Sequence, residues 1–380
     1  MNILKNTTIN YKYQFSQMFN SNSPLSMLEG DHWILGKGTQ ETQASKSDVQ
    51  KIIDGIAWFS YTQNFDPIFN DLGESVSSDA GWGCMIRTGQ MLTFQCLLRY
   101  FANIIEVDKA CLNYLVIFFF REKSVYFEWI KGKEQELTKA GDFEQLKNFR
   151  VLQSYLTDEF LGQFSFQNIV RKASIHFGKP IGEWFKSTTF LMTLNKIFKK
   201  SPFEQVKMFN VVENIFYVKK LLKKAIHMSD EEYEQVKEVQ QCLEILATKD
   251  WTSNVLLTIT TIIGMERTDP RYQVFVSKLM EVSSFTGMLG GYRQSAYYFI
   301  GKKNDEVYYY LDPHYVKSSL ESPNLKSIHS FYFDKKFMSI NYSDMCSSIS
   351  FTYMLGSKEA FADLMSALNR LERDHPSDFF

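Results

Sequence analysis

The order of the predicted elements along this 380-residue chain indicates an α+β fold. Helical hydrophobic patterns come first, and strands rich in β-branched and aromatic residues follow in the later part of the chain. A doubly wound parallel sheet would instead show strands and helices in alternation. With 44% hydrophobic and 22% charged residues, the composition is that of an ordinary globular protein that can bury a sizeable core.

The N-terminal part is expected to be helical after a flexible start. Residues 1–25 are rich in Asn, Ser and Thr and predict a flexible N-terminal arm. Apolar residues at helical spacing predict a helix within 49–65, and the stretch 66–80, with its proline, glycine and serines, predicts a loop. A helix is then predicted to begin at Cys84 and run to Tyr100.

The middle of the chain carries shorter patterns. Residues 101–150 mix helical and strand signals. Their apolar run at 114–120 is too short to cross a bilayer and predicts a buried strand or helical turn. Helices are predicted at 166–175 and 190–198, with a Gly-Lys-Pro break between them.

Residues 199–250 differ in composition from the rest of the chain. They contain no glycine and are dominated by Lys, Glu and other helix formers, which predicts a helical insertion at about 199–250. Ser229 followed by Glu232 has the spacing of a capping box, so a helix is predicted from there to about Thr248.

The C-terminal part carries the strand patterns. A β-branched run predicts a strand at 255–263, glycines predict a flexible loop at 287–291, and residues 297–311 have the pattern of a β-hairpin. Another strand is predicted at 348–353. Ser357 has the position of an N-cap before a last helix, whose apolar residues share one face: Phe361, Leu364, Met365, Leu368 and Leu371.

Charge and cysteine usage narrow the class of protein. The net charge of −1 gives no overall basic field, so we expect no nucleic-acid partner and at most a peripheral, transient contact with membranes. The cysteines include no C-x-x-C pair and predict neither a disulfide framework nor a zinc site. Because the N-terminus also lacks a signal-peptide pattern, a cytoplasmic location is expected.

The sequence around Cys84 predicts a nucleophile. Gly81 and Gly83 remove side-chain bulk beside the sulfur, and the start of the predicted helix would favour the thiolate through its N–H groups and dipole. Far downstream, Asp312 and His314 follow an extended stretch in which residues i and i+2 share a face. Asp312 could then orient the imidazole of His314, which is the arrangement of a Cys-His-Asp enzyme.

Simpler interpretations of these residues stay open at this point. A cysteine is most often a small buried hydrophobe, which is the expectation for Cys96, Cys111, Cys242 and Cys346. His314 could be an ordinary turn residue after a proline, and Asp312 an ordinary turn-starting residue before it.

The segment Ser78–Met91, with the sequence SDAGWGCMIRTGQM, resembles the active-site segment of the autophagins. These are papain-like cysteine proteases that process the ubiquitin-like modifier of autophagosomes. The resemblance implies a papain-like α+β peptidase domain over residues 26–375 and a short C-terminal tail at 376–380. Further similar blocks follow the order of the family: WFSY at 58–61, NF at 64–65, GKPIGEWF at 178–185, GG at 290–291, SAYYFIG at 295–301 and LDPH at 311–314.

The resemblance also implies roles, position by position. Cys84 would be the nucleophile, His314 the general base and Asp312 its orienter, with Tyr61 helping to stabilise the oxyanion. Trp184 would lie beside the cleft and cover the C-terminal glycine of the substrate. A gate over the active site would be formed by Tyr292, Arg293, Gln294 and Ser295.

The chain departs from the family pattern in three respects. Its gate reads Tyr292-Arg293-Gln294 where family members typically have Lys-Pro-Asn, so the backbone constraint of a proline is missing. Tyr297 stands where the family often has a histidine. Neither tail contains a clear aromatic-x-x-aliphatic docking motif.

The implied function is cleavage after the C-terminal glycine of the autophagosomal ubiquitin-like modifier, together with removal of that modifier from phosphatidylethanolamine. The expected partners are the free and the lipid-conjugated modifier, and no metal or organic cofactor is expected. Two alternatives remain. One is a non-cleaving paralogue that binds and shields the modifier, and the other is a different Cys-His-Asp enzyme such as an acyltransferase.

Overall fold

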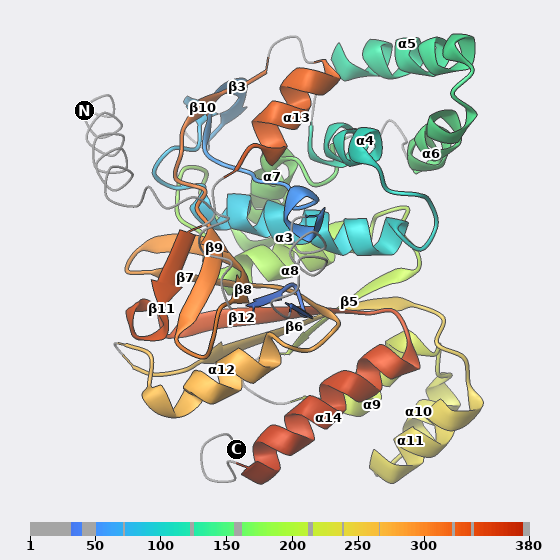
Figure 1. Ribbon diagram of the computed structural model, residues 1–380, viewed down its shortest axis with the longest axis vertical. Helices are drawn as coiled ribbons and strands as arrows, with labels where there is room; N and C mark the ends of the chain where they lie inside the picture. The colour runs from blue at the N-terminus through green and yellow to red at the C-terminus, as the bar shows by residue number, and fades with distance from the viewer. Residues whose placement is uncertain are drawn as a thin grey trace. The chain divides into compact units, whose positions relative to one another are not determined.

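The computed structural model describes residues 32–39, 51–70, 73–121, 125–155, 162–211, 216–237, 239–265, 267–320, 324–335 and 338–374 (Figure 1). The predicted arm at 1–25 and the predicted tail at 376–380 lie outside these residues. The chain divides into two compact units. The first is built mainly from Gln50–Pro202 and Leu311–Met338, and the second mainly from Phe203–Tyr310 and Ser339–Phe380.

The first unit is mainly helical. Its helices are α3 (Cys84–Phe101), α4 (Lys109–Phe120), α5 (Val125–Ala140), α6 (Phe143–Ser154), α7 (Phe166–Phe177), α8 (Ser187–Phe198) and α13 (Leu325–Phe333). Helix α3 packs against α4, α7 and α8, so nearly all of its side chains are buried. Gly89 allows the close approach of α8, because a Cβ at this position would lie 2.1 Å from the ring of Phe190.

Several predictions for this unit are confirmed. The helix predicted from Cys84 is α3, and the helices predicted at 166–175 and 190–198 are α7 and α8. The apolar run at 114–120 lies in α4, and all of its residues are buried. Helix α7 ends at Gly178, which takes the left-handed conformation with φ of +59° that favours glycine at a helix C-terminus.

A small sheet in the first unit corrects two predictions. It consists of β10 (Lys317–Ser318), β3 (Thr62–Phe69) and β4 (Ser75–Ser78), in that order, with β10 parallel and β4 antiparallel to β3. The helix predicted within 49–65 and the loop predicted at 66–80 are therefore wrong at these strands. Pairing of β3 with the nearby β4 and, at Thr62 and Gln63, with the distant β10 overrides the local signals.

The second unit is built on a mixed sheet. In sheet order its strands are β11 (Met338–Asn341), β9 (Val307–Leu311), β8 (Ser295–Lys302), β7 (Phe285–Tyr292), β12 (Ser348–Leu355), β6 (Asn254–Ile262) and β5 (Val206–Val211), with β1 (His32–Ile34) and β2 (Lys37–Thr39) attached at β8. Strands β7, β8, β12 and β6 pair antiparallel, whereas β5 and β6 are parallel. The predicted strands at 255–263 and 348–353 and the predicted hairpin at 297–311 are confirmed.

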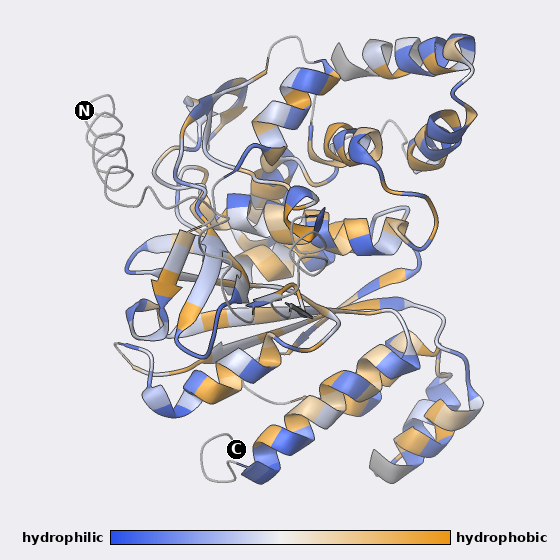
Figure 2. Ribbon diagram, viewed as in Figure 1, coloured by the Kyte–Doolittle hydropathy of each residue, from blue (hydrophilic) through white to orange (hydrophobic). Residues whose placement is uncertain are grey.

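Helices cover one face of this sheet (Figure 1). The helices of this unit are α9 (Val218–Ala225), α10 (Asp230–Gln235), α11 (Val239–Thr248), α12 (Gln273–Leu279) and α14 (Lys358–Asp374), with short 3₁₀ turns at Pro270–Tyr272 and Tyr342–Asp344. Helix α14 is the amphipathic helix predicted after Ser357, and Figure 2 shows hydrophobic and hydrophilic residues on its different sides. Its buried residues are Phe361, Leu364, Ala367 and Leu371. In the described part of the chain, no helix is long and apolar enough to cross a membrane.

The predicted helical insertion at 199–250 needs correction. Strand β5 lies within it, and the single helix predicted from Ser229 to Thr248 is divided into α10 and α11. The capping box of Ser229 and Glu232 is present at the start of α10. Because parallel neighbours require a crossover connection, α9, α10 and α11 form the link that carries the chain from β5 to β6.

The predicted flexible loop at 287–291 is also wrong, because these residues lie in strand β7. Gly287 has φ of +130°, and a Cβ there would lie 2.3 Å from the ring of Tyr298 on β8. Close packing across the sheet, and not flexibility, therefore accounts for this glycine. The helical first unit and the sheet of the second unit together confirm the α+β class.

Candidate active site

Cys84 is the first residue of helix α3, as predicted. The chain reaches it through a tight turn, in which the N–H groups of Trp82 and Gly83 donate to the carbonyl of Asp79 at 3.2 and 2.9 Å. Gly81 bends this turn with φ of +87°, a conformation that favours glycine. The N–H groups and the dipole of α3 favour a thiolate at this position. The Cys84 side chain is buried, with 5% of its surface exposed.

Asp312 and His314 directly follow strand β9, and both are buried. The Nδ1 atom of His314 lies 2.5 Å from Oδ1 of Asp312, and the backbone N–H of His314 donates to the same oxygen at 2.9 Å. The carboxylate therefore fixes the orientation of the ring, whose side chain also forms a hydrogen bond with Cys84. Trp58 supports this turn, because its Nε1–H donates to the carbonyl of Asp312 at 2.8 Å.

Opposing effects set the pKa of His314. Burial lowers it, because desolvation penalises the charged imidazolium. The hydrogen bonds to Asp312 and Cys84, and the charges of these partners, raise the pKa, and the result is about 9 in place of the ordinary 6.5. At neutral pH this arrangement favours a thiolate–imidazolium pair, which is the reactive form of a cysteine nucleophile.

Three other cysteines have a raised pKa, which disfavours their thiolate form. Burial and the charge of Asp108 raise the pKa of Cys111 to about 12, and burial raises the pKa of Cys242 and Cys346. Cys96, Cys111 and Cys242 are buried, as expected of small hydrophobic residues, whereas Cys346 is partly exposed. Within the described ranges, no group of three or more His, Cys, Asp or Glu residues could hold a metal ion.

Backbone hydrogen bonds hold Tyr61 next to His314. Its N–H donates to the carbonyl of Pro313 at 2.8 Å, and its carbonyl accepts from the N–H of Lys317 at 2.9 Å. These bonds continue the parallel pairing of β3 and β10. The buried Tyr61 ring consequently packs edge-on against the His314 ring, at a centroid distance of 5.3 Å.

Trp184 is a partly exposed aromatic residue that contacts the turn before Cys84. It lies in the connection between α7 and α8, and 47% of its surface is exposed. Its Nε1–H donates to the carbonyl of Gly81, in the turn that leads to Cys84. The indole is thus anchored at one edge and open to solvent elsewhere, as is common for aromatic residues that contact a ligand.

The predicted gate residues belong to the second unit. Tyr292 ends β7 and Ser295 begins β8, and these two residues pair across a two-residue turn. Arg293 has a left-handed backbone with φ of +52°, and its carbonyl accepts from Cys346 Sγ at 3.1 Å. The structure therefore brings Cys84, Asp312, His314, Tyr61 and Trp184 together in the first unit, whereas Tyr292, Arg293, Gln294 and Ser295 form a hairpin turn of the second.

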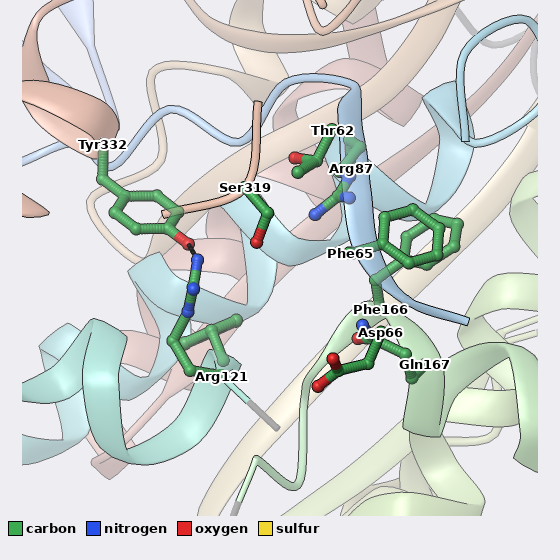
Figure 3. Close-up of a pocket in the computed structure, with 10 residues that line it drawn as sticks. Thr62, Phe65, Asp66, Arg87, Arg121, Phe166, Gln167, Ser319 and Tyr332 are labelled. Atoms are coloured by element: carbon green, nitrogen blue, oxygen red, sulfur yellow. Dashed lines mark hydrogen bonds between the residues drawn. The ribbon is translucent and has the colours of Figure 1, made fainter. Parts of the chain in front are cut away.

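Two charged residues of the site were not singled out from the sequence. Asp79 and Arg87 form a buried ion pair, with 2.6 Å between Arg87 Nε and Asp79 Oδ2. Figure 3 shows the Arg87 side chain next to Thr62, where both line a small pocket of about 40 Å³. Their sequence signal is that both lie within the Ser78–Met91 segment, but burial of a charged side chain cannot be recognised from composition.

Comparison with known proteins agrees with this geometry. The sequence pattern of the peptidase C54 catalytic domain matches residues 42–367. Cysteine protease ATG4A from Bos taurus is 27% identical over 300 residues, which cover 76% of this chain and 65% of that protein. Its Homo sapiens counterpart is 27% identical over 297 residues with the same coverage. Cysteine protease ATG4B from Xenopus laevis is 25% identical over 348 residues, covering 89% of this chain and 79% of that protein. The chain thus spans about 65% of the length of these ATG4A relatives.

Proposed function

The chain belongs to the peptidase C54 family, the autophagins, and from this premise we propose that it is a cysteine protease. In this proposal Cys84 is the nucleophile, His314 is the general acid and base, and Asp312 orients the His314 ring. The observation that carries the proposal is the hydrogen-bonded series Cys84–His314–Asp312 at the start of α3. A structural cysteine would need neither an imidazole partner nor a buried carboxylate behind that imidazole.

In the proposed reaction, the Cys84 thiolate forms a bond to the carbonyl carbon of the scissile amide. The oxyanion that develops would accept hydrogen bonds from the N–H of Cys84 and from the phenol of Tyr61. When the C–N bond breaks, the imidazolium of His314 gives its proton to the leaving amine. Water then loses a proton to His314 and attacks the thioester, which releases a carboxylate and regenerates the thiolate.

The proposed substrate is an autophagosomal ubiquitin-like modifier, cleaved after a C-terminal glycine. The Trp184 indole, hydrogen-bonded to the carbonyl of Gly81 in the turn before Cys84, would cover a residue that has no side chain. The same chemistry would hydrolyse the amide between this glycine and the amine of phosphatidylethanolamine, since only the leaving amine differs. Both the free and the lipid-conjugated modifier are therefore proposed partners, and the proposed site of action is the cytoplasm.

The experiment is cleavage of a modifier that carries an extension after its glycine, followed by intact mass measurement. Cys84→Ser is compared with Cys111→Ser, which removes a buried thiol whose pKa is raised by burial. A product ending at the glycine, lost only in Cys84→Ser, would support the proposal. Binding of the modifier without cleavage by the wild type would instead support a shielding paralogue. Turnover of an acyl-CoA without protein cleavage would support an acyltransferase.

A further inference from the structure

We propose that Asp79 is a positioning residue that holds Cys84 and Tyr61 in their catalytic places, an inference that rests on the proposed function. Asp79 is fully buried. Its Oδ1 accepts from the backbone N–H of Thr62 at 2.6 Å, and its Oδ2 accepts from Nε of Arg87 at 2.6 Å. One carboxylate therefore joins the start of strand β3 to the first turn of helix α3.

The two joined segments are the ones that carry the reacting groups. Thr62 directly follows Tyr61, so a shift of its backbone moves the phenol that packs against His314. Arg87 lies one turn into α3, where its N–H donates to the carbonyl of Gly83 at 3.0 Å. The Asp79 carboxylate thus links the proposed oxyanion donor to the helix that begins with Cys84.

Asp79 also contacts the residue before the nucleophile. A Cβ at Gly83 would lie 2.5 Å from Asp79 Oδ2 and 2.6 Å from Asp79 Cβ, so only glycine fits there. The carbonyl of Asp79 in addition accepts the N–H groups of Trp82 and Gly83. Side chain and backbone of one residue therefore shape the whole turn that ends at Cys84.

Arg87 is itself held in place from three sides. Its Nη1–H donates to Oε1 of Gln90 at 3.0 Å, and Gln90 Nε2 donates to the carbonyl of Phe164 at 2.8 Å. Its guanidinium lies 4.5 Å from the ring centroid of Phe166, which also contacts the Trp82 ring edge-on. Figure 3 shows Arg87 between Thr62 and the ring of Phe166. The cation is therefore a fixed anchor for the carboxylate.

A buried ion pair is a poor way to gain stability, because desolvation offsets most of the attraction between the charges. Burial raises the pKa of Asp79 above its ordinary value, although the charge and hydrogen bond of Arg87 oppose this. Such a pair instead selects one geometry, because each charge must keep its hydrogen-bond partners. At this position, the selected geometry is that of the proposed catalytic residues.

The test compares Asp79→Asn with Lys302→Met. Lys302 is a buried cation of the second unit, paired with Glu281 at 2.6 Å, so its variant reports the general effect of breaking a buried ion pair. Two quantities are measured below the melting temperature of both variants. One is the pH profile of Cys84 alkylation by iodoacetamide, read by peptide mass, and the other is kcat and KM for the extended modifier.

In Asp79→Asn we expect the rate of Cys84 alkylation at neutral pH to fall about tenfold. The midpoint of its pH profile should shift toward the pKa of a free thiol, because the thiolate loses its imidazolium partner. We expect kcat to fall about 100-fold with little change in KM, since a small misplacement of reacting groups has that effect. Lys302→Met should leave both quantities unchanged. Equal alkylation profiles in the two variants would overturn the proposal.

If Asp79→Asn does not fold, a second pair of variants tests the same proposal. Arg87→Lys keeps a cation beside Asp79, whereas Arg87→Met removes it. The proposal expects the lysine variant to restore most of the Cys84 alkylation and kcat that the methionine variant loses, and equal losses would overturn it. The alkylation profile needs no substrate. If the wild type cleaves no modifier but Asp79→Asn still shifts this profile, the proposed function fails and the positioning role stands.

Discussion

The ring of Tyr61 meets the ring of His314 edge-on, with centroids 5.3 Å apart and an interplanar angle of 89°. This contact depends on the backbone bond from the N–H of Tyr61 to the carbonyl of Pro313. Two purposes are therefore proposed for the tyrosine. Its ring packs against the imidazole, and its hydroxyl is the proposed donor to the oxyanion.

Tyr61→Phe separates these purposes, because it keeps the ring and removes the hydroxyl. We expect kcat to fall by about 10²–10³-fold with KM nearly unchanged, as for the loss of one oxyanion donor. Thermal melting should stay close to that of the wild type, since the buried ring remains. An unchanged kcat would show that Tyr61 only packs against His314. The measurement is steady-state cleavage of the extended modifier.

Asp312→Asn tests the orientation of His314. An amide can present its NH₂ group to the ring, which favours the wrong imidazole tautomer, so we expect kcat to fall about 10⁴-fold. His314 would also lose the negative charge that raises its pKa. Cleavage rates at several pH values check this. A loss of activity that lower pH restores fully would contradict the orientation role and indicate a pKa effect alone, because lower pH refills the imidazolium form of His314.

The raised pKa of His314 predicts an alkaline limit of activity. The imidazolium must protonate the leaving amine, so cleavage should decline as the pH rises through about 9.

The raised pKa of His314 also affects the stability of the fold. A histidine whose folded pKa of about 9 exceeds its ordinary 6.5 contributes stability that is complete below 6.5 and is lost as the pH rises through 9. Rates and melting temperatures measured across this range check both statements. A decline centred near the ordinary value would contradict the thiolate–imidazolium pair.

Trp184→Ala is expected to weaken substrate binding with little effect on folding. A partly exposed aromatic anchor is worth about 2 kcal/mol of binding, so KM should rise about 30-fold. The melting temperature should barely change, because 47% of the indole surface is already exposed. Phe143→Ala, which removes an aromatic residue that is 77% exposed in α6, is the matched control and should leave KM unchanged. A similar KM for both variants would argue against a binding role for Trp184.

Gly89→Ala tests the packing of α3 against α8. The added Cβ would lie 2.1 Å from the Phe190 ring, so the helices must separate or the ring must move. We expect a loss of about 1–3 kcal/mol in the free energy of unfolding, typical of overpacking. Adding Phe190→Leu should recover part of this loss by making room. Denaturant titration measures both variants, and additive losses would contradict a direct contact.

Local sequence explains those parts of the prediction that are confirmed. The helix that begins at Cys84 follows from a glycine-rich turn and a continuous apolar pattern. Asp312 and His314 lie two residues apart after a strand, so their contact needs only extended backbone. The hairpin at 297–311 can also be predicted from local sequence, because both strands and the turn lie in one short stretch.

Long-range contacts explain the errors. Residues 62–69 have apolar positions that also fit a helix, and pairing with Ser75–Ser78 on one side and with the distant Lys317–Ser318 on the other makes them a strand. Strand β5 was missed because its partner β6 follows only after three intervening helices. The glycines at 287–291 suggested flexibility, whereas the Tyr298 ring across the sheet requires the absence of a side chain at Gly287.

The helix start at Cys84, the Asp-Pro-His turn and the family can all be predicted from the amino-acid sequence, because each depends on neighbouring residues or on blocks in a fixed order. Tertiary structure alone decided that Cys84 meets His314, that Tyr61 packs against the imidazole, and that Asp79 and Arg87 are buried as a pair. The physical reason is that burial and hydrogen bonding between distant segments arise only when the chain closes on itself. Local spacing carries no information about which partner a side chain will then meet.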